Sequence, residues 1–157
     1  MNFREVRENK HQIFNYIRYF SKIKEVYDNF ITSFTSYLSS QVDFPVKTYE
    51  KHDNGISIKV FLDNIDIYMD YIEYNMDIWG KLVVTLNISH DKKEELFILY
   101  FNDDGQVYDS LEEVRPKTSL GNSYFSETFL LVIYQAMLSR HSYSKMRSEG
   151  MECGKSL

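Results

Sequence analysis

Few residues in this sequence have the types and spacing that catalysis requires. The stretch from Gly150 to Ser156 has the composition of a phosphate-binding loop, but three residues separate its glycines where such a loop needs four. A helix must also follow the loop to aim backbone amides at phosphate, and one residue remains after Ser156. We therefore expect no nucleotide to bind here.

Two pairs of residues have the types of a nucleophile and its base. Ser142 and Lys145 have the serine–lysine spacing of penicillin-binding enzymes, but the companion motifs of those enzymes are absent from the sequence. Cys153 and His141 lie in a polar segment near the chain end, where no scaffold is evident that would activate the thiol. We expect no catalytic residues and predict that the protein is not an enzyme.

The sequence also lacks a pattern of metal ligands. No histidine has a second histidine or cysteine at ligand spacing; the four are His11, His52, His90 and His141. The Asp-containing turns at 53–55 and 103–105 lack the alternating oxygen ligands of a calcium loop. We expect no metal and no cofactor, although a site assembled only by folding stays open.

The acidic residues are concentrated in the middle of the chain. The formal net charge is −5, and no Lys or Arg occurs between Val60 and Gly80. Such a block repels nucleic acid and suits a basic protein surface; its alternative role is a solvated face that keeps the protein soluble. The predicted partner-binding residues are Asp63, Asp66, Asp70, Glu73 and Asp77.

Aromatic residues make up 16% of the chain, with 13 Tyr and 11 Phe. Tyrosine rings suit surfaces that are partly exposed to water, so this content is typical of a protein interface, and equally of an aromatic core.

The length of 157 residues predicts one domain over 1–157. The apolar run from Phe129 to Tyr134 is too short to cross a bilayer, and the lone Cys153 fits a reducing compartment, so we expect a cytoplasmic protein without a membrane span.

Residues 1–40 form the first predicted element, a helical region without Pro or Gly. Apolar residues recur at heptad spacing, and one helix from Arg4 to about Ser40 would extend more than about 50 Å, longer than a small domain is wide. The region must either break near Ser21 or project from the domain, and a projecting aromatic seam is best covered by a second copy. We predict a homodimer with self-association residues Tyr16, Phe20, Ile23, Tyr27 and Phe30.

Residues 44–115 form the predicted antiparallel sheet. Turn signals at 52–55, 90–93 and 103–105 separate runs rich in β-branched and aromatic residues. In the stretch 64–79, alternation from Ile65 favours a strand, while the 3-4-3-4 spacing of the acids also fits a helix. We favour the strand, which would divide the five carboxylates between two faces.

A C-terminal helix over 122–141 and a polar tail over 142–157 complete the prediction. Gly121, Asn122 and Ser123 offer helix caps, and the apolar face of the helix includes Phe129 and Ile133. The fold class is therefore α+β: an antiparallel sheet of four or five strands between a long N-terminal helical region and this helix.

The whole chain also resembles a family of viral proteins in its style of sequence. It is rich in Tyr, Phe, Asn, Asp and Lys, above all in the segments from Tyr16 to Phe20 and from Asp66 to Tyr74. In this composition and in its size, the chain resembles the small early host-takeover proteins of T-even-type bacteriophages. The resemblance implies a non-enzymatic inhibitor of a host enzyme, such as the ATP-dependent Lon protease, and it assigns no residue a role. The alternative is an acidic decoy that mimics nucleic acid and blocks a DNA- or RNA-binding enzyme.

Overall fold

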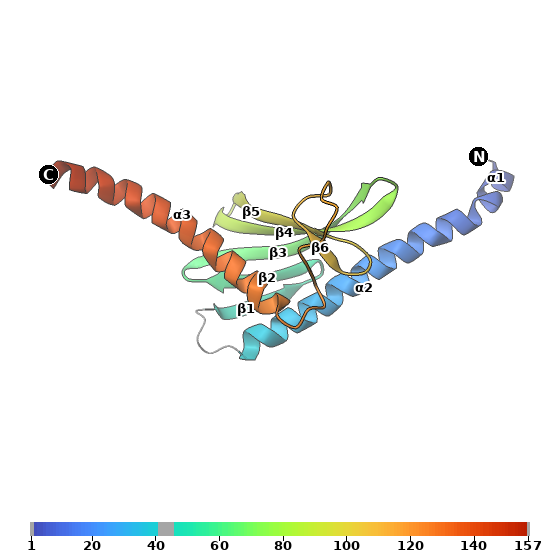
Figure 1. The fold of residues 1–157 in the computed structure, drawn as a ribbon, viewed down its shortest axis with the longest axis horizontal. Helices are drawn as coiled ribbons and strands as arrows, with labels where there is room; N and C mark the ends of the chain where they lie inside the picture. Colours follow the sequence, from blue (N-terminus) through green and yellow to red (C-terminus); the bar gives the residue numbers. More distant parts are fainter. Residues whose placement is uncertain (1, 41–45, 157) are drawn as a thin grey trace.

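The computed structural model describes residues 2–40 and 46–156, with side chains over 2–40 and 49–140. Two helices precede a sheet, and a third helix follows it (Figure 1). The helices are α1 (Phe3–Glu8), α2 (Lys10–Ser40) and α3 (Phe125–Ser156). The strands are β1 (Val46–His52), β2 (Gly55–Val60), β3 (Asp63–Tyr74), β4 (Asp77–Ser89), β5 (Lys92–Phe101), β6 (Gln106–Tyr108) and β7 (Thr118–Ser119).

The sheet is a meander in which every strand pairs antiparallel with the next strand in the chain. This confirms the α+β class and the antiparallel sheet, but the sheet has seven strands rather than four or five. The difference comes partly from short strands at its far edge, since β6 has three residues and β7 has two. Strands this short have no alternation for a sequence pattern to reveal.

The ambiguous stretch 64–79 is the long β3–β4 hairpin, so the strand prediction is confirmed. Alternation buries Ile65 and Ile67 against the core, and this burial outweighs the helical spacing of the acids. The hairpin turns at Asn75 and Met76, which both have positive φ angles, of 49° and 67°. Positive φ at both central positions is the geometry of the tight two-residue turn that matches the twist of paired strands.

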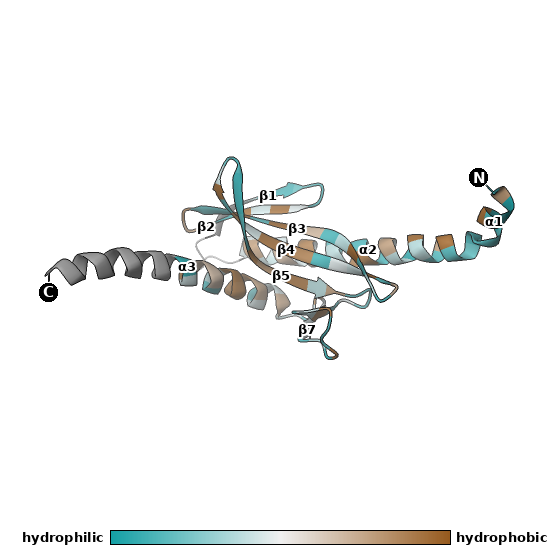
Figure 2. Ribbon diagram, turned by 90° about the horizontal axis from the view of Figure 1, so that it is seen from above, coloured by the Kyte–Doolittle hydropathy of each residue, from teal (hydrophilic) through white to brown (hydrophobic). Residues whose placement is uncertain are grey.

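Both long helices lie on the same face of the sheet (Figure 2). Between them and the sheet lies a core in which Phe30 and Phe34 of α2 make ring contacts with Phe129 of α3. Gly80 of β4 admits the ring of Phe101, because a Cβ atom at position 80 would overlap that ring. This core holds both helices against β2 to β5. The strands contribute buried side chains to it, among them Ile58, Ile67, Leu82, Val84 and Phe101.

The N-terminal helical region is interrupted at Asn9, and it does not break near Ser21, which was one of the two alternatives. From Lys10 to Ser40, α2 is continuous over 31 residues, which gives a length of about 46 Å. Its buried residues begin at Ile23, and the earlier turns extend beyond the sheet (Figure 1). The alternative in which part of the helix projects is therefore the one observed.

At the other end of the chain, α3 does not stop at residue 141. It continues to Ser156, through the segment predicted as a polar tail. That segment contains no proline, and a helix that is already nucleated extends at little cost through residues such as Lys145 and Met146. Within the described residues, no helix has the length and apolar character needed to span a membrane.

Candidate functional site

The face of the sheet opposite the helices, called the open face below, is organised in rows across the strands. Residues directly opposed on neighbouring strands point to the same side, so the register defines each row. The open face carries the rows Ser57–Asp66–Thr85–Glu95, Gly55–Tyr68–Val83–Ile98 and Asp70–Lys81–Tyr100–Tyr108, with Ile72 opposite Trp79.

Aromatic side chains form the centre of the open face. Tyr68, Trp79 and Tyr100 are half-buried, and the Trp79 ring meets the edge of Tyr108 at a centroid distance of 5.2 Å. The indole N–H of Trp79 is buried without a hydrogen-bond partner among the described residues, although such a group usually finds one. The same holds for the side-chain oxygens of Thr85 and Asn87, so polar atoms with unused hydrogen-bonding capacity lie just beneath this face.

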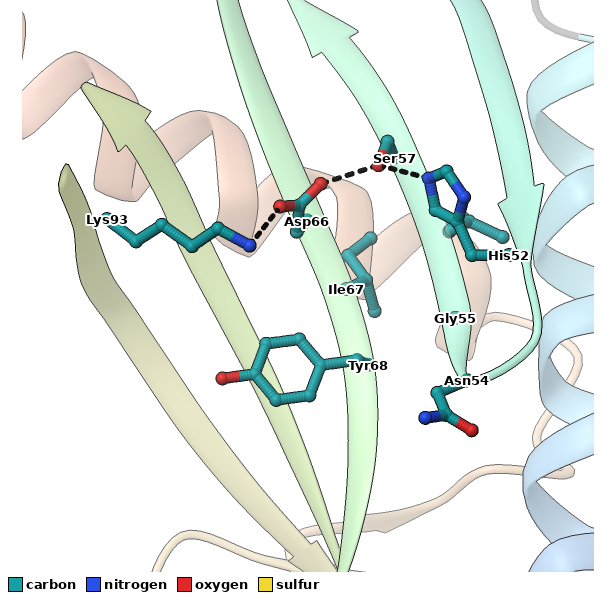
Figure 3. Close-up of a pocket in the computed structure, with 9 residues that line it drawn as sticks. His52, Asn54, Gly55, Ser57, Asp66, Ile67, Tyr68 and Lys93 are labelled. Atoms are coloured by element: carbon teal, nitrogen blue, oxygen red, sulfur yellow. Dashed lines mark hydrogen bonds and ion pairs between the residues drawn. The ribbon is translucent and has the colours of Figure 1, made fainter. Parts of the chain in front are cut away.

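A hollow of about 250 Å³ lies beside the aromatic centre (Figure 3). Gly55 is part of its wall, and no other residue fits there because a Cβ atom would overlap the backbone of Ile67. Polar side chains from four strands line the rest: His52, Ser57, Asp66, Tyr68 and Lys93.

These polar groups form one chain of contacts (Figure 3). The Ser57 hydroxyl donates to Asp66 Oδ1 at 2.5 Å, and Lys93 Nζ lies 3.1 Å from Asp66 Oδ2. His52 Nε2 lies 2.8 Å from Ser57 Oγ. Because the single hydroxyl proton of Ser57 goes to Asp66, His52 must donate in this contact.

That direction of donation is unsuited to nucleophilic catalysis. In a Ser-His-Asp triad the histidine accepts the serine proton, whereas here the carboxylate holds it. Burial raises the pKa of Asp66, but hydrogen bonds from Ser57, Lys93 and Asn87, together with the Lys93 charge, outweigh burial and lower that pKa overall. A carboxylate with a lowered pKa is a weak base near neutral pH. The contacts of this chain link side chains from four strands, β1, β2, β3 and β5.

The structure separates the five predicted partner-binding acids. Strand alternation places Asp66 and Asp70 on the open face with Asp77, while Asp63 and Glu73 point to the helix side. Asp66 is already paired with Lys93. The single acidic stripe that a helix would have presented is therefore absent from β3 and β4.

The predicted self-association residues also divide into two groups. Ile23, Tyr27 and Phe30 are at most 4% exposed in the core of a single chain, so their assignment to a second copy is corrected. Tyr27 also donates its hydroxyl to the backbone oxygen of Asn54 at 3.0 Å, and burial, with Asp28 nearby, raises its pKa. Tyr16 is half-buried and Phe20 is 38% exposed, so these two stay accessible.

Sequence reasoning missed the open face itself, because its rows depend on the register between strands. Among the side chains that the structure describes, no group of three His, Cys, Asp or Glu could hold a metal ion. Ser142, Lys145 and Cys153 lie outside the described side chains. No protein-family model, curated protein or solved structure matches this chain.

Proposed function

We propose that this protein is a non-enzymatic protein-binding module whose partner binds the open face of the sheet. One observation carries the proposal: the register places Tyr68, Tyr100 and Trp79 in three successive rows of one face, which neither α2 nor α3 covers. Tyrosine and tryptophan dominate the binding energy of protein interfaces, because they bury large rings and keep a polar tip for hydrogen bonds.

The surroundings of these rings support the same function. Charged Asp70 and Lys81 oppose each other in the row that contains Tyr100, and polar groups at the rim of an aromatic centre give an interface its orientation. The hollow beside Tyr68 has room for a side chain of the partner. We further propose that the partner is a host enzyme in the cytoplasm, such as an ATP-dependent protease; this part rests on the resemblance to phage proteins.

The acidic decoy is less well supported. A mimic of nucleic acid needs carboxylates along one surface, and β3 directs its carboxylates to both sides. Lys93 also neutralises Asp66. A protein partner that binds through aromatic contacts therefore explains the rings of the open face, which a nucleic-acid-binding enzyme with a basic groove does not.

The test begins with capture of partners from a bacterial lysate on the immobilised full chain. The test variant replaces Tyr68 and Tyr100 by serine, and the matched control replaces Tyr124, which is 72% exposed and lies outside the open face. We expect the Tyr68 and Tyr100 variant to lose the partner and the Tyr124 variant to retain it, with all three chains folded by circular dichroism.

Trp79 then serves as a reporter, because it is the single tryptophan of the chain and lies on the open face. Titration of the purified partner should change Trp79 fluorescence and saturate, with affinity at least tenfold weaker for the Tyr68 and Tyr100 variant, as for an interface hot spot. Saturable binding of the partner that neither changes the fluorescence nor depends on these tyrosines would place the interface elsewhere.

A further inference from the structure

The N-terminal arm, residues 3–22, continues the apolar stripe of α2 beyond the sheet. Ile13, Ile17 and Phe20 follow the same helical spacing as the buried residues from Ile23 onward. No described part of the single chain covers these turns fully, since exposed fractions reach 54% at Ile17 and 72% at Phe3. A contiguous apolar stripe of this kind marks an interaction surface. Its exposed members are Phe3, Val6, Ile13, Phe14, Ile17 and Phe20.

The arm is basic, and the end of the β3–β4 hairpin is acidic. The arm contains five Lys or Arg residues against two Glu residues. The hairpin end exposes Glu73 and Asp77 beyond the opposed pair Asp70 and Lys81, and residues 71–80 contain no basic residue. One chain therefore carries two surfaces of opposite charge, and each suits the other in a second copy.

The arm and the hairpin end extend from the same end of the domain in both views (Figures 1 and 2). Phe20 contacts Tyr71 edge to face, with ring centroids 4.9 Å apart, which fixes the hairpin beside the base of the arm. Met76 at the hairpin turn is 81% exposed, so an apolar side chain lies on the surface next to the acids of the hairpin end.

We propose that two copies of this chain associate through their N-terminal arms, which cross antiparallel and place each basic arm against the acidic hairpin end of the other copy. A two-fold axis near Ile13 sets Lys10 of one copy level with Tyr16 of the other, within the continuous helix α2. The same axis directs the basic residues Lys10 and Arg7 toward the base of the second arm, beside which its hairpin lies. Both the apolar stripe and the charges are then satisfied by one symmetric contact.

A second copy fits the arm better than an anionic lipid surface does. A basic amphipathic helix also binds such membranes, but the β3–β4 hairpin extends from the same end of the domain as the arm (Figure 1). Glu73 and Asp77 lie next to the turn of that hairpin and would be repelled by the lipid. The acids that an anionic membrane would repel are thus the same acids that attract the basic arm of a second copy.

Two charge-reversal variants test the proposal by sedimentation velocity of the full chain. The arm variant carries Arg7→Glu and Lys10→Glu, and the hairpin variant carries Glu73→Lys and Asp77→Lys; all four positions are exposed, so each variant should fold. We expect a wild-type dimer that weakens with salt, and a rise of about tenfold or more in the dimer dissociation constant for each variant alone. Mixing the two variants should restore the dimer, because a heterodimer has two complementary contacts whereas each homodimer has two repulsive ones.

Three results would overturn the proposal. The first is a wild-type chain that stays monomeric at about 100 µM in low salt, a concentration at which even a weak interface associates. The second is a mixture of the two variants that stays monomeric although both are folded by circular dichroism. The third is binding of the monomeric wild-type chain to phosphatidylserine vesicles that the arm variant loses, which would assign the arm to membranes.

Discussion

Replacing Met76 by glycine tests whether the turn of the β3–β4 hairpin is strained. Met76 has a φ of 67°, and the left-handed conformation costs an ordinary residue about 1–2 kcal/mol. Glycine removes that cost but loses about 0.5–1 kcal/mol through the greater freedom of the unfolded chain. The side chain is 81% exposed, so its removal from the folded state sacrifices little burial.

The expected net effect of Met76→Gly is a gain of about 0.5–1 kcal/mol in the free energy of unfolding, or roughly 1–4 °C in the melting temperature of a domain of this size. Urea unfolding followed by circular dichroism at one protein concentration measures it. Met76→Ala is the matched control, because alanine removes the long side chain and keeps the strained Cβ. A glycine variant no more stable than the alanine variant would show that the turn stores no strain.

Three further predictions concern the core and the polar hollow. In a dilute monomer, Phe30→Ala should lower the free energy of unfolding by about 3–5 kcal/mol and Phe14→Ala by about 0.5 kcal/mol or less, because Phe30 is 2% exposed and Phe14 is 53% exposed. Equal urea midpoints for the two variants would contradict the placement of Phe30 in the core and Phe14 outside it. Gly80→Ala should cost about 1–3 kcal/mol by thermal unfolding, since the Phe101 ring must leave its position, and an unaffected melting temperature would refute the close approach. The folded pKa of Asp66 lies below its ordinary value of 3.8, so the stability that this carboxylate contributes is complete above about pH 4 and is lost as pH falls through the lower folded pKa. The urea midpoints of the wild type and of Asp66→Asn should therefore become equal as the pH is lowered. If the difference between the two midpoints did not change with pH, the Asp66 charge would not be the cause of that difference.

Much of the fold was predictable because local signals agree with tertiary packing. The turn at Asp53 and Asn54 joins β1 to β2 where the sequence places it, and Ile56, Ile58 and Val60 all face the core. In the stretch 64–79, the two periods conflict, and β propensity predicts the outcome correctly. These signals span a few residues each, so they need no knowledge of the rest of the chain.

Other features could not be predicted because they depend on distant elements. Ile13 and Tyr27 occupy the same heptad position, and only the extent of the sheet decides which of the two is buried. Ser57, Asp66 and Lys93 come from three strands, and their contact follows from register alone. The sequence predicts an end of this helix at residue 141, because the polar composition after that residue is typical of a frayed chain, whereas α3 continues to Ser156.

The meander has a consequence for the order in which the protein folds. Each strand pairs with its immediate neighbour in the sequence, so the hairpins close short loops at little entropic cost. The contacts between Phe30 and Phe129 instead join residues about 100 positions apart. During synthesis, α2 and the sheet leave the ribosome before α3, so the apolar face that α3 covers stays exposed until α3 has been made. Completion of this core is thus a later step than the pairing of the strands.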